Sequence, residues 1–159
     1  MSKDKKKTFV VEPKKNNKLI AIVIGILVIS AVGFILLSGS GDRVTPVNAE
    51  AGIVKIPVAD VSDGKARFFS LNGIRFFVLK SSDGVLRTAF DACDVCFREK
   101  KGYRQEGDLM VCNNCGQAFP SEKINELRGG CNPIPVERQV QGKYLMLSEE
   151  DIKVGAGYF

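Results

Sequence analysis

A chain of 159 residues has room for one modest domain with additional segments. It contains no histidine, which excludes histidine-ligated zinc, the paired-histidine ligation of Rieske centres, C-x-x-C-H haem attachment and any mechanism with a histidine base. The net charge of +5 belongs to residues 1–41, because residues 42–159 hold 16 basic and 16 acidic residues. Without excess positive charge in the folded part, nucleic acid is not an expected partner.

The chain begins with a basic arm followed by an apolar segment. Residues 1–18 carry seven lysines against Asp4 and Glu12, and residues 19–38 are twenty residues without a charge. As a helix, a segment of that length extends about 30 Å, the thickness of a bilayer core, and so predicts a transmembrane anchor. The lysines on its N-terminal side place that end in the cytoplasm, beside anionic lipid head groups. Everything after the segment is then expected outside the cytoplasmic membrane.

A cleaved signal peptide is the alternative interpretation of the apolar segment. The segment is longer than the usual signal-peptide core. The A-x-A-like site Ala49-Glu50-Ala51 also lies more than ten residues after its end. We therefore expect an uncleaved, single-pass anchor in the cytoplasmic membrane.

Residues 39–52 are small and polar and predict a flexible linker, followed by an extracytoplasmic domain over residues 53–159. Strand signals begin at once, because apolar residues alternate with Lys55 and Pro57. Asn72-Gly73 is the strongest two-residue hairpin signal in the chain. Further turns at Asp83-Gly84 and Gln141-Gly142 separate other short apolar runs. The expected fold class is mainly β.

All five cysteines lie between residues 93 and 131. Cys93 and Cys96 form one C-x-x-C pair, and Cys112 and Cys115 form a second pair after fifteen intervening residues. Two such turns can close a tetrahedron of thiolates around a metal, so these four cysteines are the predicted ligands. Zinc, a single iron and an iron–sulfur cluster all accept four cysteines.

Disulfide bonds and thioredoxin-like chemistry are the alternatives for the two pairs. Neither pair lies in a βαβ pattern, and two matched pairs are better explained by one shared metal site. Cys131 is a fifth thiol for which three roles stay open: a metal ligand, a reactive sulfur beside the site, or a small buried residue.

The charged residues around the cysteines have two interpretations. They can form a solvated loop, or their positive charge can offset that of the thiolates. The basic residues concerned are Arg98, Lys100, Lys101 and Arg104. Asp91, Asp94 and Glu99 are expected to be surface or turn residues. Since no acid–base or nucleophile–base pair stands out, we do not expect an enzyme.

A set of short motifs in this region resembles the FtrD-like membrane iron–sulfur proteins. The motifs are Phe90-Asp91-Ala92-Cys93-Asp94-Val95-Cys96, Lys101-Gly102-Tyr103, Val111-Cys112-Asn113-Asn114-Cys115-Gly116 with Phe119, Ile124-Asn125 and Gly129-Gly130-Cys131-Asn132-Pro133. The resemblance covers roughly residues 53–150. It implies a membrane-anchored iron–sulfur protein that works with a permease and periplasmic metal-binding proteins of an iron uptake system.

The order of strands and metal loops also resembles a Rieske-type fold, with cysteines where a Rieske centre has histidines. We therefore expect a small Rieske-like or zinc-ribbon-like β domain with a four-cysteine metal site, preceded by one transmembrane helix. The leading hypothesis is an iron or iron–sulfur protein that transfers electrons or handles metal in support of iron transport. The alternatives are a structural zinc ribbon that stabilises a docking module and a thiol carrier for copper(I).

Overall fold

The computed structural model describes residues 43–159 of the chain. The predicted basic arm, the predicted transmembrane anchor and residues 39–42 of the predicted linker lie outside the described residues. Within residues 43–159, no helix has the length and apolar character needed to cross a membrane.

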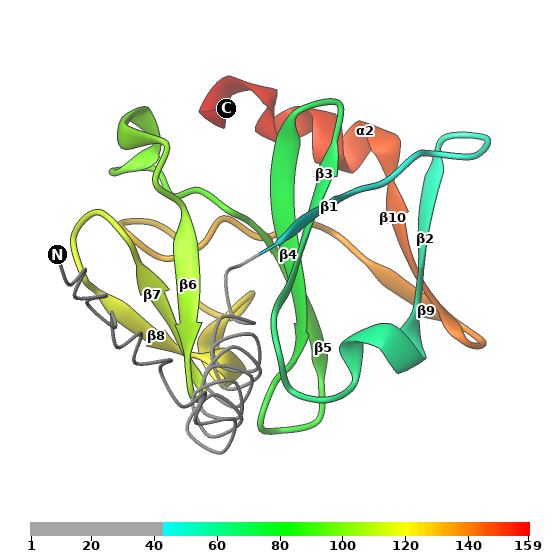
Figure 1. Ribbon diagram of the computed structural model, residues 1–159, viewed down its shortest axis with the longest axis horizontal. Helices are drawn as coiled ribbons and strands as arrows, with labels where there is room; N and C mark the ends of the chain where they lie inside the picture. The colour runs from blue at the N-terminus through cyan, green and yellow to red at the C-terminus, as the bar shows by residue number, and fades with distance from the viewer. Residues whose placement is uncertain (1–42) are drawn as a thin grey trace, which may run out of the picture. The chain divides into compact units, whose positions relative to one another are not determined.

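The central element is a four-stranded sheet with the strand order β1-β3-β4-β5 (Figure 1). Its strands are β1 (Val44–Pro46), β3 (Arg67–Leu71), β4 (Ile74–Lys80) and β5 (Leu86–Phe90). The predicted hairpin at Asn72-Gly73 is confirmed. Both residues have positive φ angles, +51° and +87°, and β3 and β4 pair antiparallel on either side of them.

Part of the segment predicted as a linker belongs to the sheet. Strand β1 lies within residues 39–52 and pairs parallel with β3, with Val44 opposite Phe68. The sequence pattern contains no sign of this pairing, because a three-residue edge strand has no periodicity and its partner lies more than twenty residues away.

Two smaller sheets accompany the central one (Figure 1). The first has the order β2-β10-β9 and joins β2 (Ile53–Pro57) to the late hairpin of β9 (Gln139–Gln141) and β10 (Tyr144–Ser148). The second has the order β6-β7-β8, from β6 (Tyr103–Glu106), β7 (Leu109–Cys112) and β8 (Ala118–Pro120).

The helical segments are short. They are the 3-10 helices η1 (Val58–Val61), η2 (Phe97–Glu99), η3 (Ser121–Lys123) and η4 (Val154–Tyr158), and the α-helix α2 (Glu149–Lys153). Ser148 caps α2, because its hydroxyl accepts a hydrogen bond from the Glu150 amide. The mainly β fold class is therefore confirmed.

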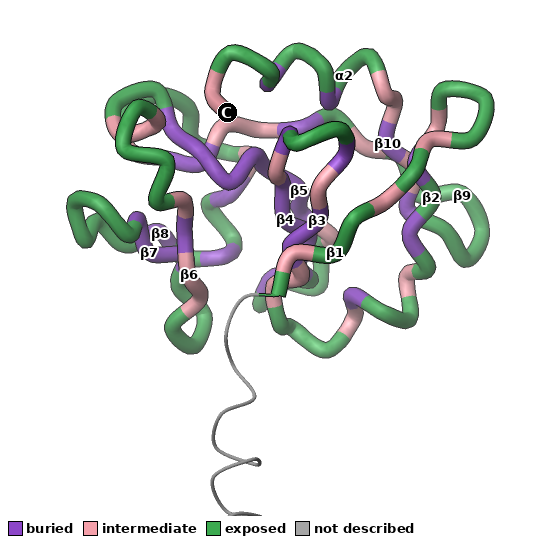
Figure 2. Tube along the Cα trace, turned by 45° about the horizontal axis from the view of Figure 1, so that its top comes forward, coloured by how far each residue is buried: buried purple, intermediate pink, exposed green. Residues whose placement is uncertain are grey.

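Side chains on both faces of the central sheet are buried, which explains its continuous apolar runs. On one face, Phe69 and Phe76 pack in a core with Leu145 and Leu147 of β10. On the other face, Phe68 and Phe77 pack in a second core with residues of β6, β7 and β8. Figure 2 shows the buried residues following β4 and β5, while the peripheral loops are exposed. The second core contains two of the cysteines and positions the site.

Candidate metal centre

The sulfurs of all five cysteines gather at one end of the second core. Cys93 and Cys96 follow β5, Cys112 is the last residue of β7, Cys115 lies in the next turn, and Cys131 comes from a later loop. All five thiols are free. The two C-x-x-C pairs, predicted from their spacing alone, are brought together from different sheets.

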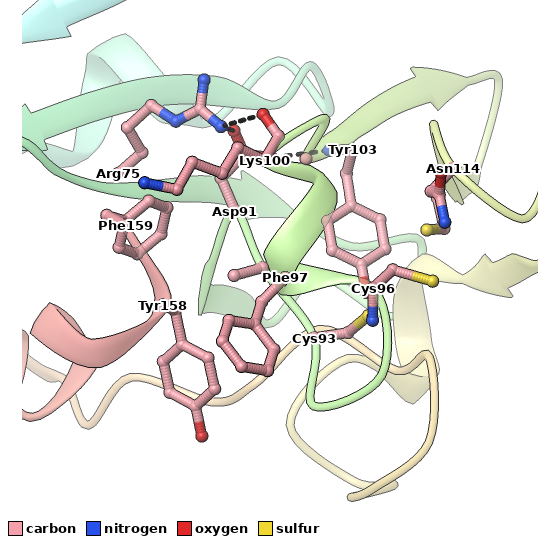
Figure 3. A pocket seen from close by; sticks show the side chains of 13 residues that line it. Arg75, Asp91, Cys93, Cys96, Phe97, Lys100, Tyr103, Asn114, Tyr158 and Phe159 are labelled. Carbon is pink, nitrogen blue, oxygen red and sulfur yellow. Dashed lines mark hydrogen bonds and ion pairs between the residues drawn. The ribbon is translucent and has the colours of Figure 1, made fainter.

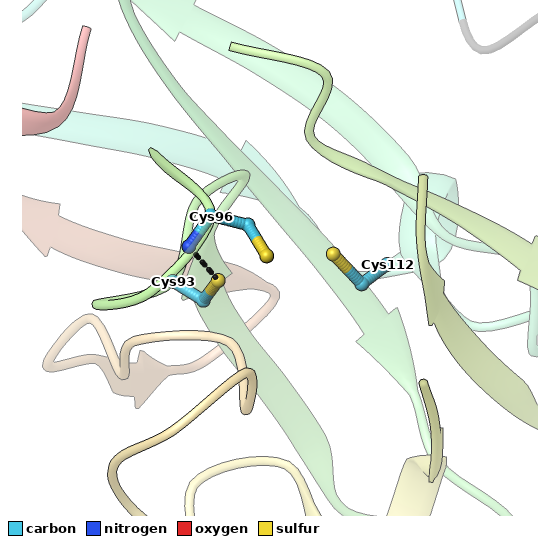
Figure 4. A group of neighbouring side chains, drawn as sticks. All are labelled: Cys93, Cys96 and Cys112. Atoms are coloured by element: carbon cyan, nitrogen blue, oxygen red, sulfur yellow. Dashed lines mark hydrogen bonds between the residues drawn. The ribbon is translucent and has the colours of Figure 1, made fainter. Parts of the chain in front are cut away.

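The sulfurs form two overlapping groups of three. In the inner group, Cys93, Cys96 and Cys112, the sulfurs lie within 4.8 Å of one another (Figure 4). In the outer group, Cys96, Cys115 and Cys131, they do so as well. Cys96 therefore belongs to both groups, and its sulfur lies 3.6 Å from that of Cys131. Either group could hold a metal ion.

Burial falls steadily across these two groups. Cys93 and Cys112 are 1% and 2% exposed and contribute to the second core. Cys96 and Cys131 are half-buried, and Cys115 is exposed. One side of the site is thus enclosed by apolar side chains, and the other opens to solvent.

The first cysteine turn is closed by hydrogen bonds to Cys93. The amide of Cys96 donates to the Cys93 sulfur over 3.1 Å, and the amide of Phe97 donates to the Cys93 carbonyl over 3.2 Å. The chain continues into η2, which ends at Lys100 with a positive φ angle of +52°. This short helix takes the place of the glycine that follows the second pair.

The second cysteine turn is followed directly by a glycine, Gly116. Gly116 has a φ angle of +75°, and its amide donates to the Cys112 carbonyl over 2.9 Å. The positive φ angle allows the chain to reverse directly after Cys115. The amide of Gln117 then points at the Cys115 sulfur.

The segment between the pairs holds the second turn in place. Asn113 donates from its backbone amide to the Gly102 carbonyl and from its side chain to the Lys101 carbonyl, both over 2.9 Å. Lys101 and Arg104 donate in return to Asn114 and Asn113, each over 3.0 Å. Two of the four basic residues therefore have a structural role that neither interpretation of the sequence anticipates.

Asp91 is buried, contrary to the expectation of a surface or turn residue. It is 6% exposed, accepts a hydrogen bond from the Tyr103 amide over 2.6 Å and forms an ion pair with Arg75 over 3.3 Å. Gly102 lies so close that an added Cβ would approach the Asp91 carboxylate to 2.3 Å. The signal in the sequence is the position of Asp91 at the end of an apolar strand, where a charge needs a partner.

Tyr103 connects the second core to the loop that carries Cys131. Its hydroxyl donates to the Cys131 carbonyl over 2.6 Å. The hydroxyl also faces the Cys93 sulfur. Burial is the main cause that raises the pKa of Tyr103. The same loop is tied to the end of β5, since the Phe90 amide donates to Ile134 and the Ile134 amide donates to Ala92. These hydrogen bonds hold the Cys131 loop beside the first cysteine turn.

The local environment separates the acidities of the thiols. Burial raises the pKa of Cys112 to about 11 and is also the main cause that raises the pKa of Cys131. At Cys115 the amide of Gln117 and the neighbouring thiol of Cys131 lower the pKa to about 7. Cys115 is therefore the most readily ionised of these three thiols at neutral pH. The thiolate is the form that binds a metal.

The C-terminal residues, which carry no readable sequence signal, pack against the first cysteine turn (Figure 3). The Tyr158 ring contacts the Phe97 ring edge-on at 5.3 Å between centroids, and its hydroxyl donates to Asp94 over 3.0 Å. Phe159 lies under the Arg75 guanidinium, 5.8 Å from ring centroid to Cζ. The C-terminus therefore contributes to the support of the site.

Comparison with known proteins identifies the family. Residues 61–159 match the family described as membrane iron-sulfur containing protein FtrD-like. The chain belongs to this family. The FtrD-like resemblance predicted from the motifs is therefore confirmed, and the matched region includes all five cysteines. Among curated proteins, none is similar enough in sequence to count as a match.

The FtrD-like chain has partial structural similarity to Rieske oxygenase systems. It is similar to the quaternary ammonium Rieske monooxygenase CntA bound to an inhibitor, with a TM-score of 0.44, 10% identity, and coverage of 60% of this chain and 30% of that one. It is also similar to a chain of the reduced complex between oxygenase and ferredoxin in carbazole 1,9a-dioxygenase, with a TM-score of 0.43, 14% identity, and coverage of 60% of this chain and 28% of that one. For a chain of the complex of reduced oxygenase and oxidized ferredoxin in the same dioxygenase, the TM-score is 0.43 and the identity 18%, with coverage of 63% of this chain and 95% of that one.

The residues of the FtrD-like site fit an iron–sulfur cluster. Such clusters are held by four cysteine thiolates, and the site supplies five converging sulfurs with two of them in an apolar core. The four sulfurs of the two pairs divide between the inner and outer groups, and each group could hold a metal ion.

Proposed function

We propose that this protein binds an iron–sulfur cluster through its cysteine sulfurs and exchanges electrons with a partner protein at the Cys115 side. The observation that carries the proposal is the convergence of five sulfurs from three separate segments in two overlapping groups. Cys93 and Cys112 would hold the enclosed side, and Cys115 with a sulfur of the outer group would hold the open side. When bound, the cluster supplies a one-electron redox centre.

The burial gradient supports electron transfer. The apolar side chains around Cys93 and Cys112 exclude water from one side, while the exposed Cys115 brings the other side to the surface, where a partner can approach. An all-thiolate site is expected to have a lower reduction potential than a Rieske centre, in the range of roughly −400 mV that is typical of plant-type ferredoxins.

The protein's cellular place is part of the same proposal. The family description supports a membrane protein, and the basic arm with the apolar segment 19–38 supports a single-pass anchor with a cytoplasmic N-terminus. The domain would then work outside the cytoplasmic membrane, beside a permease or periplasmic metal-binding proteins of an iron uptake system. Electrons delivered there could change the oxidation state of the transported iron.

We propose a carrier and not an enzyme. The buried carboxylate of Asp91 binds Arg75 and the Tyr103 amide, so a structural role accounts for it. Asp94 accepts from the Tyr158 hydroxyl. These contacts support the sulfurs as the groups that carry the chemistry.

Metal analysis of the full-length protein, purified anaerobically, tests the proposal. We expect iron and acid-labile sulfide in equal amounts, a visible absorption band that bleaches on reduction, and an electron paramagnetic resonance signal from one redox state. A colourless protein with zinc and no sulfide would support the structural zinc module instead. Copper(I) without iron would support the thiol carrier.

A further inference from the structure

The site contains one sulfur more than a cluster uses. Four cysteines hold an iron–sulfur cluster, and five converge here. Cys93 and Cys112 are fixed in the second core. The surplus therefore lies among the outer group, Cys96, Cys115 and Cys131.

Cys96 and Cys131 have similar positions relative to Cys115. Both are half-buried, their sulfurs lie 3.6 Å apart, and both sulfurs lie within 4.8 Å of the Cys115 sulfur. A metal on the Cys115 side is therefore within reach of either one. The Cys96 sulfur lies in addition within 4.8 Å of the Cys93 and Cys112 sulfurs, so the two cysteines are alternatives on the Cys115 side of the site.

The loop that carries Cys131 is anchored at and after this residue, and it has open space before it; the Tyr103 hydroxyl holds the Cys131 carbonyl. After Cys131, hydrogen bonds from Phe90 to Ile134 and from Ile134 to Ala92 tie the loop to the end of β5. Before Cys131, Gly129 and Gly130 have φ angles of +87° and +63°, and no atom lies within 4 Å of a Cβ added at either glycine. The two glycines thus leave space beside Cys131, while Asn132 donates to the Gly129 and Leu127 carbonyls and keeps the backbone of this segment in place.

We propose that Cys96 and Cys131 are interchangeable ligands, so that either one completes a cluster bound by Cys93, Cys112 and Cys115. The inference rests on the proposed iron–sulfur function. In the exchange one metal–sulfur bond breaks and another forms, and the proton of the incoming thiol passes to the outgoing thiolate. Bound charge and electron count stay the same. The exchange gives the open side of the site a ligand that can leave without loss of the cluster.

Alanine variants of the full-length protein test this inference through iron and sulfide content. Cys96→Ala and Cys131→Ala should each keep iron within about two-fold of the wild type, whereas the double variant should lose at least about ten-fold. The two single variants should also differ in their electron paramagnetic resonance spectra, because a different sulfur completes the site in each. Circular dichroism verifies that each variant is folded.

The other outcomes overturn the inference. If Cys96→Ala or Cys131→Ala alone loses iron as completely as the double variant, that cysteine is an obligatory ligand. If the double variant keeps its iron, neither cysteine is a ligand. If the wild type has a full cluster and a single variant is depleted of iron, only the proposed ligand exchange is contradicted. If the wild type itself lacks iron and sulfide, the proposed function is contradicted as well.

A measurement on the unmodified protein covers the case of a variant that does not fold. Brief alkylation of the iron-loaded wild type, followed by mass spectrometry of its peptides, reports which thiol is free. We expect one label per chain, divided between Cys96 and Cys131. A label confined to one of the two cysteines, or found on Cys115, overturns the inference.

Discussion

The carboxylate of Asp91 sets the spacing between the two cysteine turns. It lies two residues before Cys93 and accepts from the amide of Tyr103, and the neighbouring Gly102 carbonyl accepts from Asn113 in the second turn. Two hydrogen bonds, joined through the adjacent residues Gly102 and Tyr103, therefore connect the turns without passing through a metal. Burial of the carboxylate is tolerated because Arg75 pairs with it.

Gly102 is the residue at which this connection is most easily broken. In Gly102→Ala the new Cβ meets the buried Asp91 carboxylate at 2.3 Å. The carboxylate cannot move away without breaking its ion pair with Arg75. We expect the free energy of unfolding to fall by about 3 kcal/mol and the iron content to fall with it. Urea unfolding followed by circular dichroism measures the first effect, and metal analysis measures the second.

Gly107→Ala is the matched control. Gly107 has a φ angle of +59°, close to the +63° of Gly102, but no atom lies within 4 Å of its added Cβ. It should cost only the backbone strain of about 1 kcal/mol and leave the iron content unchanged. Equal effects of the two substitutions would show that contact with Asp91 is unimportant.

At the scale of the elements, residues outside any regular strand form hydrogen bonds with the edge of β5. The Thr88 amide and carbonyl both pair with the side-chain amide of Asn125, over 3.1 Å and 2.7 Å. The Thr88 carbonyl also accepts from the Val136 amide, and the Thr88 hydroxyl donates to the Val136 carbonyl. Strand β5, which precedes Cys93, and the loop that follows Cys131 are thereby joined along one edge.

Asn125 should be important for stability because its side-chain amide forms the two hydrogen bonds to Thr88 that the backbone of a neighbouring strand would otherwise form. Asn125→Ala leaves the buried Thr88 amide without this partner, and it places alanine at a φ angle of +72°. We expect a loss of about 2 to 3 kcal/mol in the free energy of unfolding, measured by urea denaturation.

Asn125→Gly separates the two causes. Glycine adopts the positive φ angle without strain but provides no amide, so it should recover about 1 kcal/mol of the loss and no more. If Asn125→Gly is as stable as the wild type, the hydrogen bonds to Thr88 contribute nothing and the residue is needed only for its backbone conformation.

Local elements could be predicted from the sequence, and distant contacts could not. The hairpin at Asn72-Gly73 and the alternation in β2 depend on neighbouring residues, and both are present. The pairing of β1 with β3 and the bond between Asn125 and Thr88 join segments far apart in the chain. Nothing in the pattern around either partner specifies the other.

The site shows the same division. The spacing of Cys93, Cys96, Cys112 and Cys115 predicts a metal centre, because each pair is a local turn with a known geometry. The arrival of Cys131 beside Cys96 depends on a loop that pairs with β5, which no local signal reveals. Asp91 reads as a turn residue for the same reason, since Arg75 comes from another strand.

At the scale of the whole domain, the central sheet separates two cores with different compositions. The core toward β2 and β10 consists of aliphatic and aromatic side chains and contains no cysteine. The core toward β6, β7 and β8 includes Cys93 and Cys112, so its packing is continuous with the metal site. Binding of a metal should therefore stabilise one side of the domain more than the other.

Removal of the metal tests this asymmetry. After chelation under anaerobic, reducing conditions, hydrogen exchange in β6, β7 and β8 should accelerate by at least about ten-fold, because the metal no longer joins Cys112 of β7 to Cys93 and only the hydrogen bonds between the turns remain. Exchange in β2 and β10 should change by less than about two-fold, since their core has no cysteine. Mass spectrometry of peptides from the loaded and the metal-free protein measures both regions together. Equal acceleration in both regions would mean that the domain opens as one cooperative unit, and that the sulfurs support the whole fold and not the sheet that presents them.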